Sequence, residues 1–125
     1  MKHLFIFAAL LLTLPVSAGG LPDEQAYAQD GKLMLDICNK FANEPDAAKL
    51  HKAAMATQYA RVISCSDYNG ECSLYGTFLS LAINVSKDND ITTAERRQMR
   101  EHLTKLRLAV ETGKRKLHKE LKSHK

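Results

Sequence analysis

Residues 24–64 read "EQAYAQDGKLMLDICNKFANEPDAAKLHKAAMATQYARVIS", and their pattern indicates two helices separated by a break. Its first part, from Glu24 to Ala42, carries apolar side chains at three- and four-residue spacing. They are Leu33, Met34, Ile37, Cys38 and Phe41. This spacing places them on one stripe and predicts an amphipathic helix.

The four residues "NEPD", 43–46, interrupt the pattern. Asn43 can close the first helix, and Pro45 stands where a second helix would begin. From Ala47 to Ser64 the chain carries six Ala and neither Gly nor Pro. That composition favours a strong helix whose small side chains let a neighbour approach closely. We therefore expect a hairpin of two antiparallel helices about residues 43–46.

Two further helices are expected downstream. The third runs from Ser73 to about Asn84, although Gly76 weakens the pattern. The fourth begins near Thr93 and continues into the basic C-terminus. Its apolar stripe comprises Met99, Leu103, Leu106, Val110, Leu117 and Leu121. Gly113 stands where the stripe requires an apolar residue, so residues 113–125 are expected to fray. The fold class predicted is all-α, a single four-helix domain with helical hairpins and a long basic C-terminal helix.

The N-terminus has the form of a secretory signal peptide. Lys2 precedes an apolar run from Leu4 to Leu14, and Ser17-Ala18 supply small residues before a cleavage point. About 11 apolar residues are too few to span a bilayer, which needs about 20. We expect residues 1–18 to be removed, residues 19–125 to form one domain, and the product to be periplasmic or secreted.

Charge is divided unevenly along the chain. Residues 19–95 hold 6 Lys/Arg against 11 Asp/Glu, a balance of −5, whereas residues 96–125 hold 11 against 3, a balance of +8. The basic end suits either an acidic partner or an anionic membrane surface, or it is a solvated helix end that complements the helix dipole. No nucleic-acid partner is expected, because residues 96–125 contain no aromatic side chain for base stacking.

Three cysteines follow the signal segment: Cys38, Cys65 and Cys72. In a helical hairpin Cys38 would lie near the turn and Cys65 about 25 Å away at the far end of the second helix. A disulfide needs Cα atoms about 4.4 to 6.8 Å apart, so the prediction is Cys65 with Cys72. Asn69-Gly70 forms a turn between them. Cys38, on the apolar stripe, is expected to be a packed free thiol, and the spacing matches no zinc motif.

Residues 84–95 allow two interpretations. They resemble an EF-hand calcium loop, with oxygen ligands at the expected positions: Asn84, Ser86, Asp88, Asp90, Thr92 and Glu95. Position six is Asn89 rather than Gly, and Lys87 and Arg96 add positive charge, so any calcium binding is expected to be weak. Alternatively, "TTAE" is a capping box in which Thr92 and Glu95 exchange hydrogen bonds at a helix start.

A second resemblance covers residues 27–69. A Cys late in the first helix, a short Pro-Asp-Ala-Ala turn and an Ala-rich second helix follow the signal segment. These features resemble the periplasmic immunity proteins that protect bacteria from type VI secretion amidase toxins. The resemblance implies an all-helical inhibitor of a peptidoglycan amidase, and no contact residue can be carried across.

No catalytic motif accompanies these features, and the histidines His51, His102, His118 and His124 are interpreted as surface residues. We therefore expect a binding protein and no enzyme, with no catalytic or cofactor-binding residues. The leading hypothesis is a periplasmic inhibitor or immunity protein against a cell-wall-targeting enzyme. The alternatives are an EF-hand-like calcium module and a membrane-surface adaptor that uses the basic tail.

Overall fold

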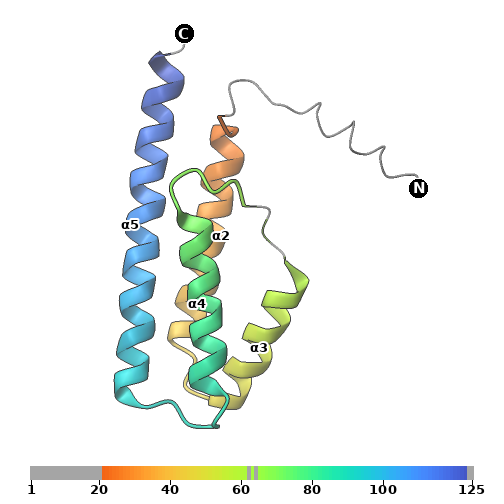
Figure 1. Cartoon of the computed structure of the whole chain (residues 1–125). Helices are drawn as coiled ribbons and strands as arrows, with labels where there is room; N and C mark the ends of the chain where they lie inside the picture. The colour runs from red at the N-terminus through yellow and green to blue at the C-terminus, as the bar shows by residue number, and fades with distance from the viewer. Residues whose placement is uncertain (1–20, 62, 64, 124–125) are drawn as a thin grey trace, which may run out of the picture.

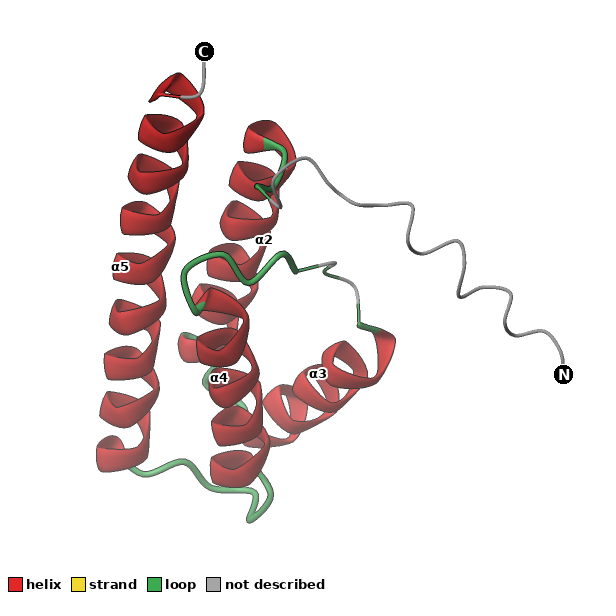
Figure 2. Cartoon of the chain, turned by 45° about the horizontal axis from the view of Figure 1, so that its top comes forward, coloured by secondary structure: helices red, strands yellow, loops and turns green. Residues whose placement is uncertain are grey.

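The computed structural model describes residues 21–61, 63 and 65–123. These residues form four helices: α2 (Glu24–Ala42), α3 (Ala47–Ala60), α4 (Glu71–Ser86) and α5 (Thr93–Ser123) (Figure 1). Figure 2 shows helices and loops but no strand in this part of the chain. The predicted all-α class with a long C-terminal helix is confirmed. The expected signal peptide, residues 1–18, lies outside the described residues.

Helix α5, with 31 residues, is the longest helix of the described part of the chain. It runs alongside α2 and α4, opposite in direction to both, and packs against each of them (Figure 1). Helix α3 leaves the lower end of α2 at an angle and packs chiefly on α4 through Leu50 and Ala54, both fully buried. The expected α2–α3 hairpin is therefore wrong as a packing pair, because the small-residue face of α3 is directed to α4.

The turn between α2 and α3 is fixed by side chains. Helix α3 begins at Ala47, and Asp46, rather than Pro45, is the residue that caps it. The Asp46 carboxylate accepts hydrogen bonds from the amides of Ala48 (2.9 Å) and Lys49 (3.2 Å). Such a cap satisfies amides that have no partner within the helix. Arg96, at the start of α5, donates to the carbonyls of Ala42 (3.1 Å) and Glu44 (2.7 Å). This arginine ties the turn to α5.

Helices α3 and α4 end and begin at backbone positions that favour turns. Arg61 adopts the left-handed conformation, with φ of 50°, so α3 ends at Ala60, earlier than the expected Ser64. Gly70, with φ of 79°, precedes α4, which begins at Glu71 rather than Ser73. Gly tolerates this conformation without the steric cost of a Cβ.

The core lies where α2, α4 and α5 meet, with α3 closing one side. Its largest fully buried side chains include Met34, Leu50, Phe78, Met99 and Leu106. On α2 the buried stripe also includes Tyr27 and Gly31, whereas Leu33 is 41% exposed. A Cβ at Gly31 would lie 2.7 Å from Cγ1 of Val110, so the glycine lets α2 and α5 approach closely. The predicted apolar stripe of α2 is therefore present, but the buried face is rotated by part of a helical turn away from Leu33.

Gly113 does not end the last helix. α5 continues to Ser123, and Leu117, one turn beyond the glycine, is fully buried. The expectation that residues 113–125 fray is wrong as far as Ser123; residues 124–125 lie outside the described part. The reason is that Gly113 is itself buried, and Tyr27, Asn69 and Glu71 occupy the space that a Cβ would take.

Candidate functional site

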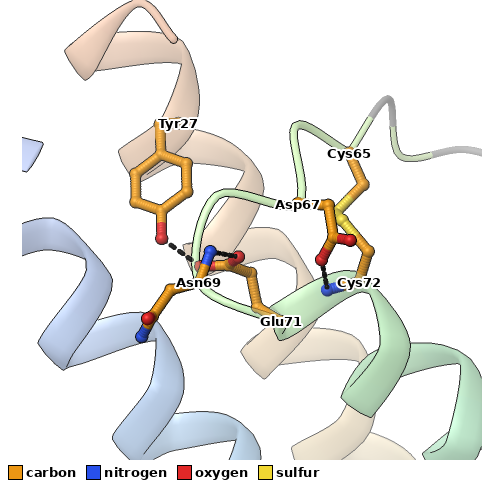
Figure 3. Close-up of a disulfide and its surroundings, with 6 residues drawn as sticks. All are labelled: Tyr27, Cys65, Asp67, Asn69, Glu71 and Cys72. Atoms are coloured by element: carbon orange, nitrogen blue, oxygen red, sulfur yellow. Dashed lines mark hydrogen bonds between the residues drawn. A yellow bond between two sulfur atoms is a disulfide. The ribbon is translucent and has the colours of Figure 1, made fainter. Parts of the chain in front are cut away.

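The predicted disulfide is present. Cys65 and Cys72 are joined, with their Cα atoms 5.9 Å apart, at the loop before α4 (Figure 3). Cys38 is a buried free thiol, as predicted, and burial raises its pKa to about 12. A thiol that stays neutral at physiological pH is a poor nucleophile, so Cys38 acts as a packing residue.

The disulfide loop is ordered by its own hydrogen bonds. Asp67 adopts a left-handed conformation with φ of 48°, and its Oδ1 accepts from the amide of Cys72 at 3.3 Å. The amide of Asn69 donates to Oε1 of Glu71 at 2.5 Å. These bonds hold the polar side chains of the loop toward the helices (Figure 3).

Glu71 is the centre of a buried polar cluster. Only 1% of this residue is exposed, and the hydroxyl of Tyr27 on α2 donates to its Oε2 (Figure 3). Glu71 is also the first residue of α4, where the helix dipole favours a negative charge. Among the described residues its carboxylate has no cationic partner. Neutral donors and the helix dipole alone offset the cost of burying this group.

The same loop contacts α5 through Asn69 and Tyr68. The side-chain amide of Asn69 donates to the carbonyl of Ala109 at 2.9 Å. The Tyr68 hydroxyl donates to Glu120, and Nζ of Lys116 lies 5.5 Å from the centre of the Tyr68 ring. Tyr68 also packs edge-on against Tyr27, with ring centres 5.7 Å apart. We call residues 65–72 together with Tyr27 the clasp, because they join α2, α4 and the C-terminal half of α5.

The clasp keeps Tyr27 neutral. Burial, followed by the hydrogen bond to Glu71 and the negative charges of Glu71 and Asp67, raises the pKa of Tyr27 well above its ordinary value of 10.0. A neutral phenol can donate a hydrogen bond to the Glu71 carboxylate, which a phenolate could not do. Only two features of the sequence point to this cluster, the Asn69-Gly70 turn and the break in the apolar stripe at Gly113. No sequence pattern indicates that Tyr27 and Glu71, 44 residues apart, lie in contact.

The candidate calcium loop is placed differently from an EF-hand. Asn84 and Ser86 lie in the last turn of α4, and the buried Ser86 hydroxyl donates to the carbonyl of Ala82 at 2.6 Å. Thr92 and Glu95 form the capping box, with bonds of 2.9 and 3.0 Å between amide and side chain. This prediction is confirmed.

The remaining candidates, Asp88 and Asp90, are exposed, and Asn89 takes the left-handed conformation with φ of 63°. No group of three or more His, Cys, Asp or Glu among the described residues could hold a metal ion. The oxygens of Ser86, Thr92 and Glu95 are thus engaged in helix-end hydrogen bonds.

The interpretation of the histidines as solvated surface residues is wrong for two of them. His51 is half-buried, and its Nδ1 lies 3.2 Å from the Ser86 hydroxyl and 3.3 Å from the Ile83 carbonyl, which links α3 to α4. His102 is half-buried, with Nδ1 enclosed and without a hydrogen-bond partner. His118 is exposed and contacts Glu24 at 2.7 Å. The Ser86 hydroxyl beside His51 is itself buried.

The outward side of α5 carries basic side chains along its whole length. We define the basic face as the following exposed residues: Arg97, Arg100, Arg107, Leu108, Arg115, Lys119 and Lys122. Leu108, 65% exposed, lies near its middle. In the part of the chain that the structure describes, none of these arginines and lysines makes an ion pair. The exposed carboxylates Glu101 and Glu111 partly offset the charge.

A groove of about 480 Å³ lies between α2 and α5. Ala28, Leu35 and Val110 form its apolar lining. Its rim carries both signs of charge, Lys32 and Lys114 against Asp36 and Glu111, and Lys32 is paired with Asp36 at 3.1 Å. The groove therefore has no net charge preference, unlike the basic face.

No family model matches the chain, and neither a curated protein nor a solved structure does. Among the described residues, no helix is both long and apolar enough to cross a membrane.

Proposed function

We propose that this chain is an exported helical binding protein that inhibits a cell-wall-targeting enzyme, in the manner of an immunity protein. The observation that carries the proposal is the basic face of α5, a row of cations without ion-pair partners among the described residues. The disulfide supports export, because such bonds persist mainly in oxidising compartments. The resemblance of residues 27–69 to periplasmic immunity proteins supports the inhibitor class.

The chemistry of the basic face suits an acidic protein surface. Exposed cations attract an oppositely charged partner, raise the association rate and fix its orientation. Arginine is enriched at protein interfaces, and an exposed apolar residue within a polar surround can enter a pocket on the partner. Leu108, near Arg107 and Arg115, provides this combination.

An anionic membrane surface is a less suitable partner. A helix that lies in the membrane interface buries a broad apolar face in the lipid. The apolar stripe of α5 is already buried in the core, with Met99, Leu106 and Leu117 fully enclosed. Leu108 is the one large hydrophobic residue of the described part of α5 that is exposed.

The proposal is tested by titrating the chain into a type VI secretion peptidoglycan amidase and following peptidoglycan hydrolysis. We expect hydrolysis to be lost at about one equivalent of the chain. Sedimentation with phosphatidylglycerol vesicles provides a parallel measurement. Full amidase activity at a tenfold excess of the chain would overturn the inhibitor proposal, and vesicle binding in that case would favour the membrane adaptor.

A further inference from the structure

We infer that the clasp is a redox-sensitive device: reduction of Cys65–Cys72 by a dithiol releases residues 111–123 of α5 while the core keeps its fold. The consequence for binding rests on the proposed function, because Arg115, Lys119 and Lys122 of the basic face lie in this segment. The conformational change itself does not depend on any partner.

α5 is held by two different layers of contacts. As far as Val110, its buried side chains belong to the main hydrophobic cluster with Met34 and Phe78. Beyond Val110, Leu117 is the one fully buried apolar side chain of the described part of α5, and it lies outside that cluster. The contacts with the clasp are polar or close backbone contacts: Tyr68 donates to Glu120, Tyr27 lies beside Gly113, and Asn69 donates to the carbonyl of Ala109 at the boundary. Contiguous units with their own contacts can open separately from the rest of a fold.

The clasp contains features that favour opening. The Glu71 carboxylate is buried without a cation among the described residues. Opening of the clasp would let water hydrate this carboxylate, which stabilises the open state. Asp67 is held in the left-handed conformation, which is strained for a residue with a Cβ. The disulfide opposes both, because it removes conformational freedom from the open loop. Once the cross-link is cut, the same loop gains that freedom on opening.

The chemical step is thiol–disulfide exchange. One thiolate of the dithiol attacks a sulfur of Cys65–Cys72 and forms a mixed disulfide with release of one cysteine thiolate. The second thiolate of the reagent then displaces the other cysteine. Two electrons pass from the dithiol to the protein, which yields two protein thiols and the cyclic oxidised reagent. Both cysteines are only half-buried, so the bond is not enclosed by the core.

Hydrogen-exchange mass spectrometry on the full chain, with and without dithiothreitol, tests the inference. We expect amides of residues 111–123 to exchange at least tenfold faster after reduction, and those of residues 78–85 to be unchanged. The variant Cys65→Ser/Cys72→Ser should exchange fast without the reagent and should not respond to it. Glu71→Gln, which removes the buried charge, should show a smaller acceleration than the wild type.

Two results would overturn the inference. One is unchanged exchange of residues 111–123 after mass spectrometry has confirmed reduction of the bond. The other is equal acceleration in all four helices, which would mean that the disulfide supports the whole fold. Because no partner is present, neither result bears on the amidase titration, and a failed titration leaves the exchange result intact.

Discussion

Glu71 shows how a single residue can connect three helices. It begins α4, accepts from Tyr27 on α2, and orients Asn69 toward the backbone of α5. A buried carboxylate is costly unless its hydrogen bonds are made, so each donor matters more than a surface bond would. The stability of this end of the molecule should therefore depend on Tyr27.

Replacing Tyr27 with Phe should lower the free energy of unfolding by about 1 to 3 kcal/mol, because the Glu71 carboxylate loses a donor while remaining buried. Urea unfolding at pH 7 measures this loss. Tyr59→Phe is the matched control, since Tyr59 is 77% exposed and its replacement should change little. Equal effects of the two substitutions would show that the Tyr27–Glu71 bond contributes nothing.

The same tyrosine should affect stability at alkaline pH. Its pKa is raised in the folded state, so above pH about 10 the unfolded chain loses this proton first. The stabilisation is complete below pH 10 and falls as the pH rises toward the folded pKa. Unfolding at pH 9 to 11 should show a shallower decline for Tyr27→Phe than for the wild type. A parallel decline would contradict the assignment.

Two helical glycines offer a direct comparison. An added methyl group at Gly113 would collide with the Tyr27 hydroxyl and lie 3.0 Å from Glu71 Oε2, whereas nothing lies within 4 Å of one at Gly76. Gly76→Ala should raise stability by about 0.5 to 1 kcal/mol through helix propensity. Gly113→Ala should lower it by about 1 to 3 kcal/mol despite that gain. Thermal unfolding of both variants distinguishes them, and a stabilising Gly113→Ala would contradict the packing described.

At the scale of elements, the pattern of apolar residues predicted four helices and the bounds of α2 and the start of α5. It failed where contacts distant in sequence decide. The sequence pattern places both Leu33 and Met34 on the apolar stripe of α2. The packing of α2 against α4 and α5 buries Met34 and leaves Leu33 exposed. Similarly, Gly113 alone suggests a helix break. In the structure Tyr27, 86 positions earlier, fills the space beside this glycine, and the helix continues.

The end of α5 provides the test at this scale. Leu117 is fully buried, whereas Leu121, one turn later, is half-buried. Leu117→Ala should cost about 2 to 4 kcal/mol and Leu121→Ala clearly less. Thermal unfolding monitored by circular dichroism measures both. Little effect from either would restore the expectation of a frayed tail.

For the whole molecule, sequence predicted the disulfide, the capping box of Thr92 and Glu95, and the charge division, because each depends on residues close together in the chain. The clasp could not be predicted, because its members come from α2, the 65–72 loop and α5. The structure thus joins the basic end and the disulfide, which are separate in sequence, into one unit.

We propose that the basic face of α5 binds an acidic protein partner, and calorimetric titration of the amidase with Arg107→Glu/Arg115→Glu measures this binding. Lys49→Glu/Lys52→Glu, two exposed positions on α3, is a control with the same change in charge. We predict at least tenfold weaker binding for the α5 variant and near wild-type affinity for the control. Equal affinity of the two variants and the wild type would contradict the account.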